Sequence, residues 1–334
     1  MKAFVLEKQQ PIETRPLKLV ELPRPRPGPG EILVRVTACG ICRTDLHIVE
    51  GDIPPHKLPV IPGHQIVGVV EEQGPGVKQP EIGARVGVPW LYDTCSVCRL
   101  CRSGKENLCK KALFTGYDRD GGFAQYTLVP AGSAYELPGR LDDVGVAPLL
   151  CGGVIGWRAL CLSGAKSGEV LGLFGFGASA HIVLQLARAR GIRVFVFTRS
   201  PEHMKVAEKL GAQWTGRAED QPPEPLQSAI VFAPAGKLVP RVLSLLDRGG
   251  VCALAGIYMS PIPELDYAEH LYHERVLRSV ANSTRQDVRN LLSEAERAGV
   301  VTEHRVFPFS ELNEALLLLK QSKLKASGVL KIDV

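Results

Sequence analysis

Residues 170–180 read VLGLFGFGASA, and this stretch decides how the second half of the chain is expected to fold. The apolar run 170–174 predicts a buried strand, and the apolar spacing over 178–190 predicts a helix. Between them, Gly175, Gly177 and Ala180 form a Gly-x-Gly-x-x-Ala turn. Such a turn lets the backbone approach a pyrophosphate closely and directs a helix N-terminus at it. We therefore expect a dinucleotide-binding site between this strand and this helix.

The next predicted strand covers residues 194–197. The residues directly after it indicate which dinucleotide binds. A carboxylate at this position would bind the free ribose hydroxyl of NAD(H), but the chain has Thr198, Arg199 and Ser200 there. A missing carboxylate together with an arginine suits a 2′-phosphate. The sequence therefore predicts NADP(H) in preference to NAD(H), the alternative being that Arg199 is only a solvated loop residue.

The chain has two regions with different sequence patterns, and this motif lies in the second. Residues 31–138 contain short β-rich runs separated by Gly and Pro clusters, which predicts an irregular, mostly β domain. After Cys151, strand and helix patterns alternate, which is typical of a doubly wound parallel sheet covered by helices. The sequence thus predicts an α/β protein of two domains.

Composition excludes several classes of protein. Of the 334 residues, 45% are hydrophobic and 22% charged, far from a disordered composition. The 40 basic and 35 acidic residues leave too small an excess, without a long basic block, to favour nucleic-acid binding. We see neither a signal peptide nor an apolar run long enough for a membrane span, so we expect a cytoplasmic protein. There, nine cysteines indicate metal binding or chemistry rather than disulfides.

Four cysteines lie close together in one loop-like stretch. Cys95, Cys98, Cys101 and Cys109 are separated by two, two and seven residues, among polar neighbours. Thiolates at this spacing can converge on one tetrahedral zinc, which would leave no open position and would hold the loop. An iron–sulfur cluster and unrelated structural thiols are the alternatives, although the last spacing does not fit the ferredoxin pattern.

A second set of ligands is spread over the chain. Cys42, His64 and Cys151 offer two thiolates and one imidazole, the ligand set of a catalytic zinc with a vacant fourth position. Each residue taken singly is weak evidence for a metal site, because an isolated cysteine is more often a small core residue.

Together these motifs resemble the zinc-dependent alcohol dehydrogenases of the medium-chain dehydrogenase/reductase superfamily. The likeness runs along the whole chain and is carried by residues 40–47, the Gly63-His64 pair, the four-cysteine loop, Cys151 and the glycine turn. It implies a GroES-like catalytic domain at 1–150 with 296–334 and a Rossmann domain at 151–295, with the active site between them. It also implies a dimer or tetramer that interconverts alcohols and aldehydes or ketones by hydride transfer to or from NAD(P).

The resemblance further implies roles for individual residues. Cys42, His64 and Cys151 would hold the catalytic zinc, and the four-cysteine loop a structural one, giving two zinc ions per chain. The remaining site residues would be Asp45, which orients His64; Arg43, near the cofactor pyrophosphate; Thr44 and His47, in a proton relay; and Trp90, a bulky pocket wall favouring small primary alcohols.

One position departs from the family. Relatives usually carry Glu directly after the zinc-binding histidine, whereas this chain has Gln65. A neutral amide would leave the metal site more positive and favour a bound alkoxide.

Three other functions compete with this interpretation: a polyol or other alcohol dehydrogenase of the same superfamily, a zinc-free quinone reductase, and a non-enzymatic zinc-binding module. A quinone reductase would lack Cys42 and the four-cysteine loop, and a module would lack the glycine turn.

Overall fold

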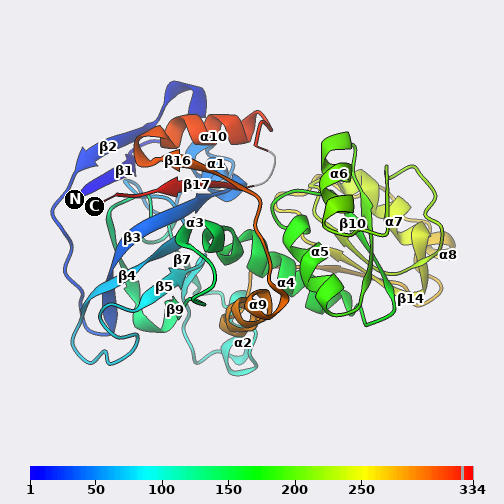
Figure 1. Ribbon diagram of the computed structural model, residues 1–334, viewed down its shortest axis with the longest axis horizontal. Helices are drawn as coiled ribbons and strands as arrows, with labels where there is room; N and C mark the ends of the chain where they lie inside the picture. The colour runs from blue at the N-terminus through cyan, green and yellow to red at the C-terminus, as the bar shows by residue number, and fades with distance from the viewer. Residues whose placement is uncertain (325–326, 334) are drawn as a thin grey trace. The chain divides into compact units, whose positions relative to one another are not determined.

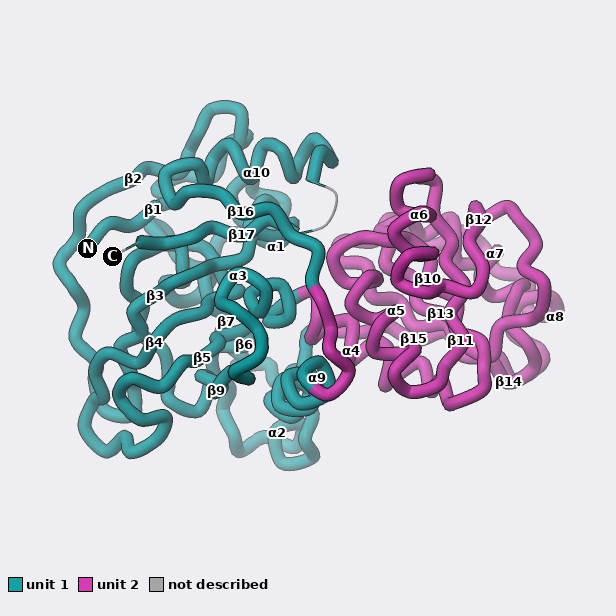
Figure 2. The backbone as a smooth tube through the Cα atoms, in the orientation of Figure 1, with its two compact units in different colours: residues 1–151, 282–296, 302–334 teal, residues 152–281, 297–301 magenta. Residues whose placement is uncertain are grey.

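The computed structural model describes residues 1–324 and 327–333 (Figure 1). These divide into two compact units, one of residues 1–151, 282–296 and 302–334 and the other of residues 152–281 and 297–301 (Figure 2). The expected domain limits, 1–150 with 296–334 and 151–295, stay a prediction, and residues 282–296 group with the first unit in the structure.

The first unit is built on a mostly antiparallel seven-stranded sheet. Its strands run in the order β16-β17-β3-β4-β5-β9, with β8 also paired to β3, and only β16 and β17 are parallel. These strands are β3 (Glu31–Ile41), β4 (Gln65–Gln73), β5 (Arg85–Val88), β8 (Tyr126–Pro130), β9 (Tyr135–Glu136), β16 (His304–Pro308) and β17 (Ser327–Lys331). Two small antiparallel pairs accompany the sheet, β1 (Lys2–Leu6) with β2 (Leu17–Glu21) and β6 (Leu91–Asp93) with β7 (Leu113–Phe114).

The core of this unit forms where apolar strand residues meet the loops that carry the candidate ligands. Ile32, Ile66 and Phe123 are fully buried in it. The helices of the unit are α1 (Arg43–Glu50), α2 (Arg99–Arg102), α3 (Asp143–Val146), α9 (Arg285–Ala298) and α10 (Leu312–Lys320). Because α1 follows β3 directly, the rigid sheet fixes where that helix begins.

The second unit contains a six-stranded parallel sheet in the order β12-β11-β10-β13-β14-β15. Counted within the unit, this is the order 3-2-1-4-5-6 of a doubly wound dinucleotide-binding fold. Its strands are β10 (Val170–Phe174), β11 (Arg193–Phe197), β12 (Trp214–Gly216), β13 (Leu226–Val231), β14 (Leu246–Leu254) and β15 (Val276–Ser279). Its helices are α4 (Gly152–Ser163), α5 (Ala180–Ala189), α6 (Pro201–Lys209), α7 (Val239–Leu245) and α8 (Tyr267–His270). The predicted α/β fold class, with a mostly β unit and a Rossmann unit, is confirmed.

Among the described residues, no single helix has the length and apolar composition needed to cross a membrane, although the bent pair 143–150 and 152–163 meets that test when taken together.

Candidate metal centres and cofactor site

The first candidate ligand, Cys42, lies at the start of helix α1. Its sulfur accepts a hydrogen bond from the Thr44 N–H at 3.2 Å, and its own N–H donates to Asp45 Oδ2 at 2.9 Å. This reciprocal cap satisfies backbone donors that the first turn would otherwise leave free. The positive end of the helix also favours a thiolate over a thiol. Local helix geometry therefore fixes the sulfur and favours its anionic form.

His64 is oriented by the same carboxylate. Its Nδ1 lies 2.9 Å from Asp45 Oδ1, and the two side chains are 1% and 0% exposed. The preceding Gly63 has φ of +98°, and a Cβ there would lie 2.7 Å from the Phe123 ring, so the turn requires glycine. Because Nδ1 faces Asp45, Nε2 is left to face Cys42, whose sulfur is 3.3 Å away.

Cys151 completes this set after the short helix at Ala147–Leu150, with its sulfur 3.9 Å from that of Cys42. The ligand atoms of Cys42, His64 and Cys151 all lie within 4.8 Å of one another. A tetrahedral zinc with bonds of about 2.3 Å to sulfur and about 2.1 Å to nitrogen separates two sulfurs by about 3.8 Å, and a sulfur from a nitrogen by about 3.6 Å. The observed spacings fit this geometry, and three protein ligands leave the fourth position open.

Burial and mutual hydrogen bonding shift the titration of all three groups. The hydrogen bond from Cys151 is the largest cause that lowers the pKa of Cys42 well below its usual value, and the same bond, with burial, raises the pKa of Cys151. Burial alone would lower the pKa of His64, but the charges of Asp45 and Cys42 outweigh it and raise that pKa well above its usual value. Burial raises the pKa of Asp45, opposed by His64. Without metal the cluster therefore holds protons that zinc must displace.

The relay candidates lie on α1. Thr44 is buried, and His47 follows one helical turn later. The His47 Nδ1 lies 2.7 Å from Asp52 Oδ2, just beyond the helix end at Gly51. Sequence reasoning missed Asp52. The available signal was a carboxylate five residues after the candidate base, but acidic residues near helix ends are common.

Arg43, at the start of α1, is exposed and donates to Ser322 Oγ at 3.2 Å.

Trp90 lies against the imidazole of His64. Their ring centroids are 5.0 Å apart in an edge-to-face arrangement. Phe114 stacks on the indole at 5.0 Å with an angle of 13° between the rings, and the Tyr117 ring stacks 6.0 Å away. Aromatic neighbours therefore hold the indole next to the open metal site.

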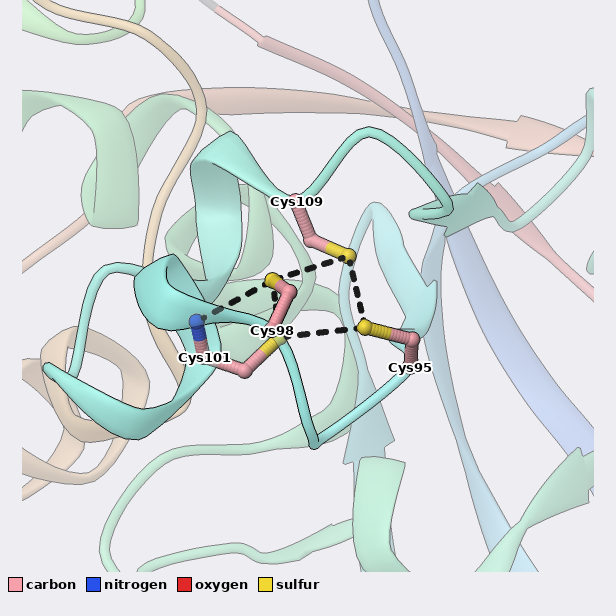
Figure 3. Close-up of side chains that lie close together, drawn as sticks. All are labelled: Cys95, Cys98, Cys101 and Cys109. Carbon is pink, nitrogen blue, oxygen red and sulfur yellow. Dashed lines mark hydrogen bonds between the residues drawn. The ribbon is translucent and has the colours of Figure 1, made fainter.

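The four sulfurs of the second candidate metal site point toward one another from one loop (Figure 3). Cys95 and Cys101 have sulfurs 3.9 Å apart, Cys98 and Cys101 3.5 Å, Cys98 and Cys109 3.9 Å, and Cys109 and Cys95 3.5 Å. These separations again fit a tetrahedral metal, for which about 3.8 Å is expected. Helix α2 supplies part of the scaffold, because Cys98 is its N-cap and accepts from the Cys101 N–H. Short-range geometry thus closes the site with four thiolates.

Backbone donors prepare this loop for metal. The N–H groups of Val97 and Cys98 lower the pKa of Cys95 to about 6. Burial raises the pKa of Cys101 to about 11, and a hydrogen bond from the Thr94 side chain opposes that shift. Some thiols of the metal-free loop are therefore ionised at neutral pH and others are not.

The glycine turn of the second unit has the shape that a pyrophosphate needs. Gly175 has φ of +90°, and a Cβ there would lie 2.9 Å from the Ala233 N atom. A Cβ on Gly177 would meet nothing within 4 Å, so the backbone is open there. Ala180 begins α5, and the N-cap Ser179 makes no side-chain hydrogen bond to the first turn. The Ser179 side chain thus takes up none of the N–H groups at this end of α5, while the His181 N–H donates to the Gly177 carbonyl at 3.2 Å. The positive end of the helix can still face an anion.

The three residues after β11 differ in their exposure. Thr198 is buried, and its hydroxyl accepts from the Ser200 N–H at 3.4 Å. Ser200 caps α6 by accepting from the His203 N–H at 3.3 Å. Arg199 is exposed and makes no ion pair with any residue that the structure describes.

Known proteins are similar to this chain over its whole length. A family model described as alcohol dehydrogenase GroES-like domain matches residues 28–139, and one described as zinc-binding dehydrogenase matches residues 180–297. The "Probable alcohol dehydrogenase AdhA" of Mycobacterium tuberculosis is 45% identical over 99% of this chain and 97% of its own length. An alcohol dehydrogenase of Geobacillus stearothermophilus is 35% identical over the full length of both chains. The chain belongs to the zinc-dependent alcohol dehydrogenase family.

Solved structures agree with this membership. Cinnamyl alcohol dehydrogenase from Sorghum bicolor superimposes on this alcohol dehydrogenase with a TM-score of 0.90 at 26% identity, over 99% of this chain and 97% of the other. As a member of this family, the chain described here interconverts alcohols and carbonyl compounds and uses zinc and a nicotinamide cofactor. The three-ligand cluster and the open glycine turn fit these two groups.

Gln65 directly follows the candidate ligand His64 in this alcohol dehydrogenase. Its side chain is 3% exposed and fills the space above Gly40, where a Cβ would lie 2.8 Å from the Gln65 Cδ atom. The Nε2 atom is buried and has no hydrogen-bond partner among the described residues. The buried amide therefore packs against Gly40 and adds no negative charge.

Proposed function

We propose that this alcohol dehydrogenase acts on small primary alcohols and their aldehydes, with Cys42, His64 and Cys151 as ligands of the catalytic zinc. The contact between Trp90 and His64 supports this substrate class, because a clamped indole beside the open ligand position leaves little room for branched carbon chains. When bound, zinc lowers the pKa of a coordinated alcohol and the nicotinamide accepts hydride.

Two polar side chains on α1 would carry the proton that the alcohol substrate releases. The buried Thr44 hydroxyl would accept it near the substrate, and His47 would release it at the surface. Asp52 accepts a hydrogen bond from His47 Nδ1, so Nε2 is the nitrogen that can take up a proton. Asp45 would act on the metal side by keeping His64 Nε2 directed at zinc.

A substrate panel tests this assignment. We expect kcat/KM to be highest for short primary alcohols and to fall for branched ones, and loss of both catalytic zinc and turnover in Cys42→Ala. An equal preference for polyols, or unchanged zinc and turnover in that variant, would overturn the assignment.

We also propose that each chain holds two zinc ions, the second bound by the four-cysteine loop. The four converging sulfurs and the lowered pKa of Cys95 support this stoichiometry. Metal analysis of the purified enzyme should give two zinc ions per chain, and one per chain would refute the proposal.

We propose NADP(H) as the preferred cofactor. The exposed, unpaired Arg199 and the absence of a carboxylate at the end of β11 support it, since a guanidinium can bind a 2′-phosphate. Replacing Arg199 by Gln should raise KM for NADP(H) while leaving KM for NAD(H) unchanged. A parallel change in both values would count against this role.

The cofactor unit offers a surface for a second copy of the chain. Strand β15 lies at the edge of the parallel sheet, and Val276, Tyr267 and Tyr272 near it are 44%, 66% and 63% exposed. We propose a homodimer or homotetramer that pairs these edges. Sedimentation of Val276→Asp should show a smaller assembly than the wild type.

We also propose a cytoplasmic location, because the two candidate metal clusters need reduced thiols.

A further inference from the structure

Arg285, the first residue of α9, contacts the four-cysteine loop from outside. Its N–H donates to Glu106 Oε1 at 2.8 Å. Its guanidinium donates to Thr94 Oγ1 at 3.1 Å and to Asp93 Oδ1 at 3.3 Å. These partners lie 179 to 192 residues away in the sequence, so one residue connects the helix to two separate points of the loop.

Both points adjoin metal ligands. Thr94 directly precedes Cys95, and Glu106 lies between Cys101 and Cys109. The Glu106 carbonyl also accepts from the Cys109 N–H at 3.0 Å. Thr94 and Glu106 are only 7% and 9% exposed, so water competes little for these hydrogen bonds. Arg285 therefore restrains the backbone at the first and the last ligand of the loop.

The guanidinium of Arg285 is 23% exposed and is directed at the loop by Thr94 and Asp93. A planar fork that reaches two acceptors at once is a property of arginine that lysine lacks.

We propose that Arg285 is a positioning residue that couples metal retention in the four-cysteine loop to docking of the start of α9. This inference rests on the proposed second zinc. Coupling between two equilibria is reciprocal, so docking of the helix start strengthens metal binding by the same factor by which bound metal strengthens docking. Because α9 begins just after the chain re-enters the first unit at residue 282, the loop metal would hold this return segment in place.

The test compares two arginines on one helix. Arg285→Gln removes the guanidinium contacts to Thr94 and Asp93 and keeps the backbone N–H contact to Glu106. Arg289→Gln, one turn later, instead removes a guanidinium that lies 5.6 Å from the Tyr135 ring centroid. Holoenzyme is incubated with a zinc chelator and iodoacetamide, and alkylation is followed by mass spectrometry. Peptides carrying Cys95 to Cys109 report the loop, and those carrying Cys42 and Cys151 report the other metal in the same sample.

We expect the loop cysteines of Arg285→Gln to be alkylated about tenfold faster than in the wild type, in line with the effect of losing a partner that positions metal ligands. Alkylation of Cys42 and Cys151, and every rate in Arg289→Gln, should stay at the wild-type value. Hydrogen exchange at residues 283–288 of the wild type should rise when the loop metal is removed.

Three results would overturn the proposal. Equal loop alkylation in the two variants, or equal acceleration at both metal sites, would show that Arg285 does not act on the loop specifically. Unchanged hydrogen exchange after metal loss would show that the helix start is not coupled to it. If Arg285→Gln does not fold, Thr94→Val removes one acceptor while leaving α9 intact and must accelerate loop alkylation. A wild type with one zinc per chain would refute the second zinc itself, a failure that metal analysis separates from the others.

Discussion

Replacing Asp45 by Asn should weaken zinc binding at the catalytic site, because the two carboxylate oxygens have different donors. Oδ1 faces His64 Nδ1 at 2.9 Å and Oδ2 accepts from the Cys42 N–H at 2.9 Å, and the Asp45 side chain is fully buried. Asparagine has one oxygen and one NH₂ group. Whichever way the amide turns, one buried donor loses its acceptor and meets another donor.

The expected loss of zinc affinity follows from this one unsatisfied donor. A buried donor left without a partner costs about 1–3 kcal/mol. Loss of a carboxylate that orients a metal-bound histidine typically lowers metal affinity about 10- to 100-fold, which corresponds to about 1.4–2.8 kcal/mol. The two estimates agree. Asp45→Asn should therefore raise the zinc Kd of the catalytic site by about one to two orders of magnitude.

The assay is competition for zinc with a chromogenic chelator at pH 7.5, where the four-cysteine loop serves as an internal reference. Asp118→Asn is the matched control, since Asp118 Oδ1 lies at the same 2.9 Å from a histidine Nδ1, that of His56, but this histidine is 59% exposed. The control should keep wild-type affinity. An Asp45→Asn variant that binds catalytic zinc within twofold of the wild type would refute the reasoning.

Three further predictions concern cofactor, acidity and substrate. Gly177→Val should weaken dinucleotide binding about tenfold or more without lowering Tm, because the valine side chain enters open space that the pyrophosphate needs. Gly175→Ala should weaken binding and also lower Tm, because φ at position 175 is +90°. The affinity of the catalytic site for zinc should keep rising above pH 6.5, because the raised pKa of His64 means that zinc competes with a proton there; chelator titrations from pH 6 to 8.5 that give a flat profile would contradict this. Trp90→Ala should improve kcat/KM for secondary relative to primary alcohols about tenfold, measured by steady-state rates, and an unchanged ratio would remove the indole from the pocket wall.

Local features of the fold were predictable from sequence. The turn at Gly175 was readable because its φ of +90° favours glycine and because an apolar strand precedes it. The parallel sheet was predictable from the alternating strand and helix patterns, because the period of the apolar residues reflects which face of each element is buried. Asp52 was missed because its contact with His47 depends on the path of the chain after Gly51, which no periodic pattern encodes.

The sequence by itself determined the four-cysteine site, because its ligands lie within one short loop and their spacing limits how far apart the sulfurs can be. Tertiary structure alone brought Cys42 to Cys151, which are 109 residues apart, and Arg285 to Thr94, which are 191 apart. Spacing along a chain constrains distance only over a few residues. Beyond that, the packing of strands and helices decides which side chains meet.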